Sequence, residues 1–183
     1  PVSLLPGVAE HRQDAYRERN PQMLVPFAED GDVGIAQSQA ILEYLEEKYS
    51  ECPLLPGSAA ERASVRSVCN SICCDIHPLN NLRVLRYLKE ELGTSPEQQD
   101  AWYAHWIHEG FRAAELTAAE HGGPFVFGGS VTLADVCLVP QVYNAQRFMV
   151  PLDDVPNLVA VDAHCGGLPA FAAALPENQP DCQ

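Results

Sequence analysis

Residues 20–49 read NPQMLVPFAEDGDVGIAQSQAILEYLEEKY. Leu24–Ala28 and Val33–Ala36 are two short apolar segments, and the acidic, glycine-containing turn at 29–32 separates them. Such a pair of segments around a tight turn is typical of a β-hairpin. After Gln37 the apolar residues recur at helical spacing, namely Ile41, Leu42, Leu45 and Tyr49. This stretch therefore predicts a strand, a tight turn, a second strand and a helix.

The segment before the hairpin predicts one more strand and one more helix. Val2–Leu5 is a short apolar segment, and a polar helix over His11–Arg19 is expected to end at Asn20-Pro21. The order strand, helix, hairpin, helix makes a small α/β unit over residues 1–55. The proline- and glycine-rich sequence CPLLPG at 52–57 cannot continue a helix and is interpreted as a linker.

Strand signals end after Ala60, and the rest of the chain predicts helices. Apolar residues at helical spacing mark one helix that Pro78 should kink or restart, and a second that contains both tryptophans, Trp102 and Trp106. Thr132, followed three residues later by Asp135, is a capping arrangement that predicts the start of a third helix. We expect an all-helical domain over 60–183, so the fold class is α/β plus all-α.

The composition narrows the classes of partner. Of the 183 residues, 25 are Asp or Glu and only 11 are Lys or Arg, which gives a net charge of −14 and argues against nucleic acid as a partner. An anionic ligand would have to be held by a few local arginines. The seven cysteines are an odd number without repeated spacing, which favours reduced thiols in the cytoplasm. No apolar run is long enough to predict a membrane span.

Four stretches resemble the glutathione transferases. They are NPQMLVP at 20–26, QSQAILEYLEE at 37–47, DIHPLNNLRVL at 75–85 and TLADVCLVPQVYNAQRF at 132–148. The first two are widespread among transferases, whereas the last two resemble the zeta class, in particular the maleylacetoacetate and maleylpyruvate isomerases. The resemblance implies a thioredoxin-like glutathione-binding domain, a helical substrate-binding domain and a homodimer.

The resemblance also leads us to expect an incomplete N-terminal domain. Members of the family open with a strand and a helix that carry a Ser-rich motif, and this chain begins at what would be their second strand. The first strand of that fold is central, so Val2–Leu5 would have no ladder partner without it. The catalytic residue therefore stays unknown, and its Ser motif is expected upstream of Pro1.

By resemblance, five residues contact glutathione: His11, Val25, Gln37, Ser38 and His77. Pro26 would follow a cis peptide bond that presents the Val25 backbone to the tripeptide, and the helix that starts at Gln37-Ser38 would bind its γ-glutamyl carboxylate. His77 would act from a partner subunit. For His11, a solvated surface histidine is the alternative, and many helices begin at a serine, so Ser38 alone is a weak signal.

Asn81, Arg83 and Arg147 resemble the substrate-facing residues of the isomerases. A guanidinium binds a carboxylate through two parallel hydrogen bonds, which suits a maleyl-keto acid. The alternative for each arginine is a surface salt bridge. Thr132 and Asp135 are interpreted as structural.

Two pairs of side chains have the spacing of metal ligands. They are Cys73 with His77, and His105 with His108. Two ligands are too few for a structural zinc site, and partly exposed helix positions explain the second pair, so no metal is expected.

The function implied by the resemblance is a glutathione-dependent cis–trans isomerase that converts maleylacetoacetate to fumarylacetoacetate in aromatic amino acid catabolism. Glutathione would be a coenzyme whose thiolate adds reversibly to the cis double bond. Three alternatives stay open: a maleylpyruvate isomerase, a general zeta-class transferase or dehalogenase, and a transferase-like binding module without activity.

Overall fold

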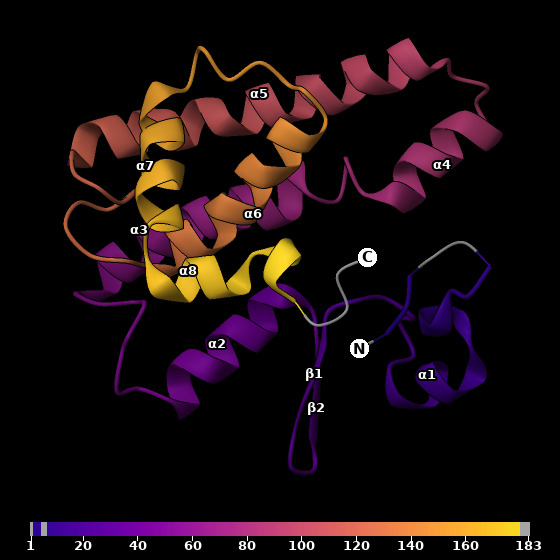
Figure 1. Ribbon diagram of the computed structural model, residues 1–183. Coiled ribbons are helices and arrows are strands. Elements are labelled where there is room, and N and C mark those ends of the chain that lie inside the picture. The colour runs from indigo at the N-terminus through magenta and orange to yellow at the C-terminus, as the bar shows by residue number, and fades with distance from the viewer. Residues whose placement is uncertain (1, 5–6, 180–183) are drawn as a thin grey trace. The chain divides into compact units, whose positions relative to one another are not determined.

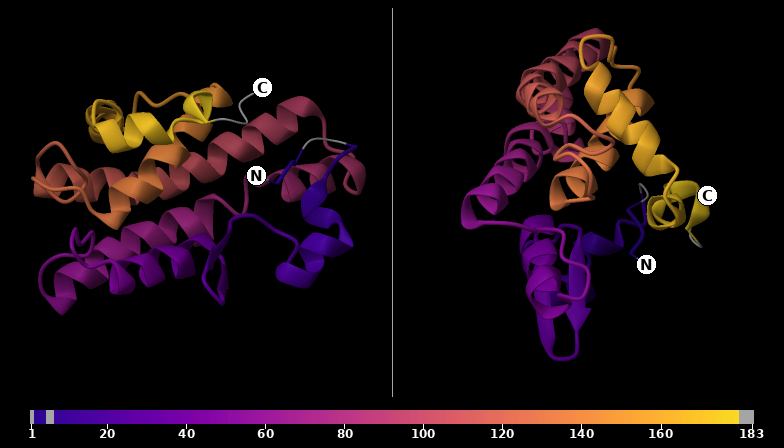
Figure 2. Two further views of the ribbon diagram at one scale, coloured as in Figure 1. Left: turned by 60° about the horizontal axis from the view of Figure 1, so that its bottom comes forward. Right: turned by 90° about the vertical axis from the view of Figure 1, so that its left-hand side faces the viewer.

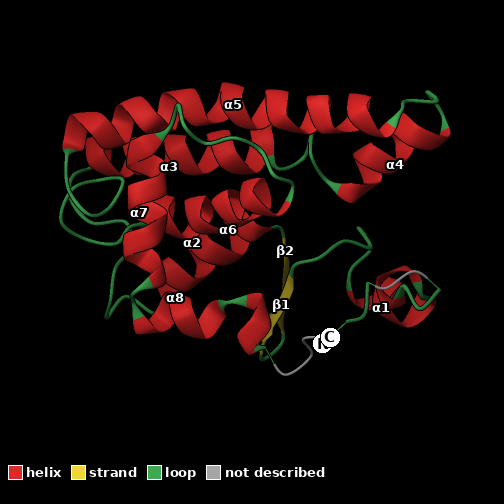
Figure 3. Cartoon of the chain, turned by 45° about the horizontal axis from the view of Figure 1, so that its top comes forward, coloured by secondary structure: helices red, strands yellow, loops and turns green. Residues whose placement is uncertain are grey.

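A computed structural model describes residues 2–4 and 7–179. The chain divides into two compact units, of which the first ends at Pro53 and the second covers Leu54–Gln179. The first unit is α/β and the second is helical, as the colours of Figure 3 show. The predicted fold class is confirmed.

The first unit contains a hairpin between short helices. Its elements are the 3₁₀ turn η1 (Glu10–Arg12), helix α1 (Asp14–Arg19), strands β1 (Phe27–Asp30) and β2 (Val33–Ala36), and helix α2 (Ser38–Lys48). Figure 1 labels these two helices and two strands. The strands are antiparallel, with Phe27 opposite Ala36 and Asp30 opposite Val33. The Phe27 ring lies over Gly34, where an added Cβ would be 2.9 Å from the Phe27 Cζ. The predicted hairpin and the helix after it are confirmed, although β1 begins at Phe27 rather than at Leu24.

Two predictions for the start of the chain need correction. Val2–Leu4 form no strand, and Leu5 lies outside the described residues. A strand needs a partner for its ladder, and within the described residues β1 and β2 pair only with each other. The predicted helix over His11–Arg19 is divided into η1 and α1, because Gln13 between them has an extended backbone with φ −82° and ψ 156°.

The second unit is helical, and α5 is the longest of its described helices. Its elements are α3 (Ala59–Asn70), the π-helical turn η2 (Ser71–Ile76), α4 (Leu82–Glu90), α5 (Pro96–His121), α6 (Leu133–Arg147), α7 (Pro156–Gly166), α8 (Pro169–Ala174) and the 3₁₀ turn η3 (Pro176–Asn178). Helix α5 contacts η2, α4 and α7, while α6 contacts α3, η2 and α7, an arrangement that the two views of Figure 2 show. Ile107, Phe111, Leu138 and Leu158 are completely buried in the core between them. No helix among the described residues has the length and apolarity needed to cross a membrane.

The helix is interrupted near Pro78, as the sequence predicts. The π-helical turn η2 ends with the His77 N–H donating to the Ile72 carbonyl at 2.8 Å, and α4 starts afresh at Leu82. Ile76, completely buried at the end of η2, lies directly against α5 at Gly110. A Cβ at Gly110 would be 2.2 Å from Ile76 Cγ1. This close approach fixes the position of the turn at 77–81, which carries the predicted site residues His77 and Asn81.

Candidate functional site

The loop before β1 is held by buried polar side chains. The Asn20 side chain is 1% exposed and donates to the Leu24 carbonyl at 2.7 Å, and the Tyr16 hydroxyl donates to the same carbonyl at 2.6 Å. The next peptide bond, Val25–Pro26, is cis, and Val25 is 45% exposed. No hydrogen bond of the Val25 backbone occurs within the described residues. The geometry therefore leaves its N–H and C=O available to a peptide-like ligand. Asn20 and Tyr16 were not predicted to have this role, although Asn20 lies in the conspicuous NPQMLVP stretch.

The N-terminus of α2 is the second part of the site in the first unit. Helix α2 begins at Ser38, and no acidic residue occurs in its first turn. No carboxylate of this turn therefore competes for its N-terminal N–H groups and positive dipole end, which suit the carboxylate of a ligand. Gln37 precedes the helix with φ 77°, a left-handed value that is rare for a residue with a side chain. Its amide donates to Gln22 Oε1 at 2.6 Å, a contact that helps to hold this conformation.

His11 lies in η1 and is half-buried rather than fully solvated. Its Nδ1 atom is buried and has no hydrogen-bond partner within the described residues. An imidazole nitrogen in this state can accept or donate a bond to a ligand, so the geometry agrees better with a binding role than with a solvated surface histidine.

In the second unit, the turn between η2 and α4 carries His77 and Asn81. The Asn81 Oδ1 accepts from the Arg83 N–H at 3.1 Å, so Asn81 is the N-cap of α4. The Trp102 indole N–H donates to the Leu79 carbonyl at 2.7 Å and anchors the turn to α5. His77 is exposed as a whole residue, yet the protein around its ring removes water and lowers the pKa of the imidazole. The neutral form of His77 is therefore favoured.

Arg83 and Arg147 come from different elements. Arg83 lies in the first turn of α4, whereas Arg147 is the last residue of α6, and both are exposed. Neither has an ion-pair partner in the part of the chain that the structure describes, although acidic residues outnumber basic ones by 25 to 11. The salt-bridge alternative therefore finds no support at either position. Arg147 lies close enough to Tyr103 for its charge to act on that hydroxyl, whose pKa burial raises to about 12.

Thr132 and Asp135 form the capping arrangement of α6. The completely buried Asp135 carboxylate accepts from the Thr132 N–H at 2.7 Å, from the Thr132 hydroxyl at 3.0 Å and from the Val126 N–H at 2.9 Å. Asp135 therefore also holds the loop before the helix, a role that the sequence did not predict because Val126 is nine residues away.

The two histidine or cysteine pairs considered as metal ligands have other contacts. Cys73 Sγ lies 3.9 Å from Cys137 Sγ, and His108 Nδ1 lies 3.3 Å from Asp154 Oδ2. The His105 ring meets Trp106 edge to face, with 4.9 Å between the ring centroids. Within the described ranges, no group of three or more His, Cys, Asp or Glu side chains is arranged to hold a metal.

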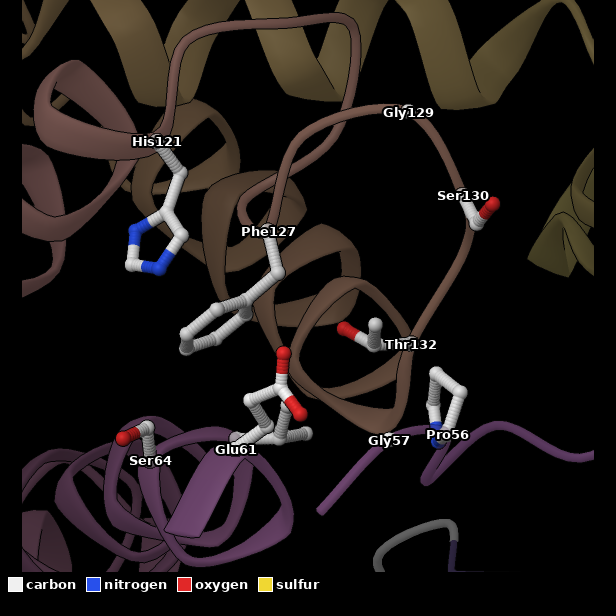
Figure 4. A pocket seen from close by; sticks show the side chains of 10 residues that line it. Pro56, Gly57, Glu61, Ser64, His121, Phe127, Gly129, Ser130 and Thr132 are labelled. Carbon is white, nitrogen blue, oxygen red and sulfur yellow. The ribbon is translucent and has the colours of Figure 1, made fainter.

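A cavity in the second unit was not predicted from the sequence. It measures about 300 Å³ and lies between the start of α3, the end of α5 and the loop before α6. Figure 4 shows the rings of His121 and Phe127 side by side, with Glu61 below them on α3. Of the predicted site residues only Thr132 lines it. The Glu61 carboxylate accepts from the Ser58 N–H at 2.7 Å, which lowers the pKa of Glu61, so this cavity contains a carboxylate and does not suit an anionic substrate.

Comparison with known proteins identifies the family. Residues 1–53 match the family described as glutathione S-transferase, N-terminal domain. The chain is 45% identical over 96% of its length to a probable maleylacetoacetate isomerase of Vibrio cholerae, of which it covers 81%. It is 46% identical over 96% of its length to a maleylpyruvate isomerase of a Ralstonia species, of which it covers 84%.

Two solved structures have the same fold over nearly the whole chain. The holo structure of a maleylpyruvate isomerase, described as a bacterial zeta-class glutathione S-transferase, has a TM-score of 0.92 and 45% identity, covering 95% of this chain and 83% of the other. A maleylacetoacetate isomerase of Methylobacterium extorquens AM1, with bound malonate and GSH, also has a TM-score of 0.92, at 31% identity, covering 100% of this chain and 86% of the other. The chain therefore belongs to the zeta-class glutathione transferases of the maleylacetoacetate and maleylpyruvate isomerase family.

Proposed function

We propose that this protein is a glutathione-dependent cis–trans isomerase that converts maleylacetoacetate to fumarylacetoacetate in aromatic amino acid catabolism. The observation that carries the proposal is the identity to named isomerases, which extends through both units rather than through the N-terminal domain alone. In the proposed division, residues 1–55 form the thioredoxin-like glutathione-binding domain and residues 60–183 form the substrate-binding domain.

The first unit offers contacts of the kind that a tripeptide needs. The exposed Val25 backbone can pair with a peptide group in the manner of an added strand. The N–H groups at the start of α2, beside Gln37 and Ser38, can donate to a carboxylate, and His11 has a buried nitrogen without a partner in the described part of the chain. When bound, glutathione supplies the thiol that adds reversibly to the substrate's double bond. The residues of this unit hold and orient the tripeptide.

The second unit offers contacts for the carboxylates of the substrate. Arg83 and Arg147 are exposed and without ion-pair partners within the described residues, so both guanidinium groups are available to an anion. Asn81 lies at the same turn as Arg83 and adds an amide. Positive charge at these positions would also stabilise the negative charge that develops on the substrate oxygens during addition. A solved relative with bound malonate, a dicarboxylate, supports this reading.

Maleylpyruvate is the second candidate substrate, because the Ralstonia relative that bears that name is as similar as the Vibrio one. An ultraviolet assay of the full-length protein with each maleyl acid, and with a chlorinated aromatic as a conjugation substrate, separates the candidates. We expect isomerisation of maleylacetoacetate with the higher kcat/KM. Faster turnover of maleylpyruvate would transfer the assignment to that substrate, and conjugation without isomerisation would indicate a general transferase or dehalogenase.

We also propose a homodimer in the cytoplasm, with His77 acting at glutathione from a partner subunit. Large apolar side chains are exposed on and after α4, including Leu82 at 68%, Tyr87 at 59% and Leu92 at 63%, and such side chains favour an interface. The six described cysteines are thiols rather than disulfides, which suits a reducing compartment. Sedimentation equilibrium tests the dimer: a dimeric mass is expected, and an active monomer would exclude a role for His77 across subunits.

A further inference from the structure

Three cysteines from three elements meet inside the helical unit. They are Cys69 of α3, Cys73 of η2 and Cys137 of α6. The Sγ atoms of Cys73 and Cys137 are 3.9 Å apart, although the two residues are separated by 64 positions in the sequence. Cys69 is completely buried and Cys137 is 8% exposed, whereas Cys73 is only half-buried. None of these thiols has a role in the proposed isomerisation.

The three thiols differ in their access to solvent, and the pKa of the Cys137 thiol is raised. Hydrogen bonding to Cys69 is the main cause that raises the pKa of the Cys137 thiol to about 12, and burial adds to it. Cys137 is therefore a neutral thiol at physiological pH. Cys73 is the member of the cluster that a small oxidant in water can reach, because it retains partial exposure.

We propose that Cys73 and Cys137 are a site of reversible oxidation, at which a peroxide converts the two thiols into an intramolecular disulfide. In the first step the Cys73 sulfur attacks one oxygen of hydrogen peroxide, the O–O bond breaks, and the displaced hydroxide leaves as water with the proton of the Cys73 thiol. Cys73 becomes a sulfenic acid. In the second step the Cys137 sulfur attacks the Cys73 sulfur, the S–O bond breaks, and hydroxide leaves as water with the proton of the Cys137 thiol.

Reduction returns both thiols at the expense of a dithiol, or of two molecules of a monothiol that become a disulfide. The proposal rests on the positions of these sulfurs and not on the proposed isomerase activity. It therefore stands or fails separately from that activity.

The geometry requires only a local adjustment. A disulfide holds its sulfurs about 2.05 Å apart, so the two Sγ atoms must approach by roughly 2 Å. Helix α6 and turn η2 are already in contact. The bond would tie η2, which is followed directly by His77, to α6, which ends at Arg147. Oxidation would thus restrain the turn and the helix that carry proposed site residues.

Peptide mapping tests the site on the unmodified protein. Trypsin releases Cys69, Cys73 and Cys74 in the peptide 67–83 and Cys137 alone in the peptide 113–147. After treatment with one equivalent of hydrogen peroxide and alkylation of the remaining thiols, we expect these two peptides to be joined, with fragmentation placing the bond at Cys73. The titratable thiols should fall from seven to five per chain and return to seven with dithiothreitol.

Three single variants assign the bond. Cys73→Ala and Cys137→Ala should each abolish the joined peptide, whereas Cys74→Ala, at the exposed neighbouring cysteine, should retain it. Circular dichroism identifies a variant that does not fold, and the mapping of the unmodified protein does not depend on any variant. A bond from Cys137 to Cys69, oxidation confined to the exposed Cys52 and Cys74, or disulfide-linked dimers in place of the internal bond would each overturn the proposal.

Discussion

Arg147 ends helix α6 with an exposed guanidinium that has no ion-pair partner within the described residues. An arginine on the surface of a protein with net charge −14 has many carboxylates to choose from, so its availability is informative. The same is true of Arg83 at the start of α4. At the residue scale, the substrate assignment depends on these two side chains more than on any other.

Replacement of Arg147 by alanine should weaken the substrate interaction alone. A charge-assisted hydrogen bond contributes about 1.5–3 kcal/mol, so we expect kcat/KM for the maleyl acid to fall by about 10- to 100-fold. Glutathione affinity, measured by calorimetry, should stay nearly unchanged. The matched control is Arg112→Ala on α5, whose guanidinium already pairs with Glu109 at 3.1 Å, and its kcat/KM should equal that of the unmodified protein. Loss of glutathione binding in Arg147→Ala would contradict the assignment.

His77 offers a test of its local environment. Loss of water around its ring lowers the pKa of the imidazole below the ordinary 6.5, so the folded state holds the proton less tightly than the unfolded state. The resulting loss of folding stability is absent at pH values above the pKa of His77 in the unfolded state. It grows as the pH falls from that value toward the lower pKa of the folded state. The Tm of the unmodified protein minus the Tm of His77→Gln should therefore be lower at pH 5 than at pH 7.5. A Tm difference that does not change with pH, or an NMR titration of His77 at or above 6.5, would contradict this.

At the scale of elements, the cap of α6 is a local sequence motif that also stabilises a contact with another part of the fold. The Thr132 and Asp135 spacing predicts where the helix starts, because a capping box is made by residues three apart. The same carboxylate also binds the Val126 N–H, which belongs to the preceding loop. One side chain therefore fixes both the helix and the loop that leads into it.

Asp135→Ala should be costly because it leaves two N–H groups and one hydroxyl without their acceptor in a buried place. We expect a loss of about 2–4 kcal/mol in the free energy of unfolding, measured with urea. Gln98→Ala removes the matching residue from the exposed capping box of α5 and should cost only about 0.5–1 kcal/mol. Equal costs at the two positions would show that Asp135 is no more than a cap.

Gly110 on α5 tests the contact that positions the turn after η2. Alanine normally stabilises a helix by about 1 kcal/mol relative to glycine, but here the new Cβ would be 2.2 Å from Ile76 Cγ1. Since overpacking costs about 1–3 kcal/mol, we expect Gly110→Ala to lower Tm. Gly166→Ala, on α7 with no atom near the added Cβ, should leave Tm unchanged or raise it. Ile76→Val in the Gly110→Ala background should recover part of the loss, and stabilisation by Gly110→Ala would contradict the contact.

The elements that could be predicted from the sequence are those that local signals determine. The hairpin follows from its turn residues, the break after Ile76 from Pro78, and the start of α6 from its cap. The left-handed backbone of Gln37 and the π-helical turn η2 could not be predicted, because contacts between residues distant in the sequence stabilise them. For the same reason Val2–Leu4 do not form the expected strand, since pairing partners and not propensity decide whether a strand forms.

At the scale of the whole molecule, the proposed function divides between the two units. The first provides a peptide edge and a helix N-terminus that suit glutathione, and the second provides arginines that suit a dicarboxylate. The strongly acidic surface repels anions at long range, so binding of a maleyl acid has to depend on local contacts in the second unit. The family and the fold class could be anticipated from four stretches of sequence, whereas the individual site residues remain predictions.

The central claim is that glutathione acts as a coenzyme and not as a consumed substrate. The direct test follows maleylacetoacetate isomerisation by the full-length protein in the ultraviolet, with and without glutathione, while the concentration of free glutathione is measured throughout. We predict that isomerisation requires glutathione and that its concentration is the same at the end as at the start. Isomerisation without glutathione, or loss of one glutathione for each substrate molecule converted, would contradict the account.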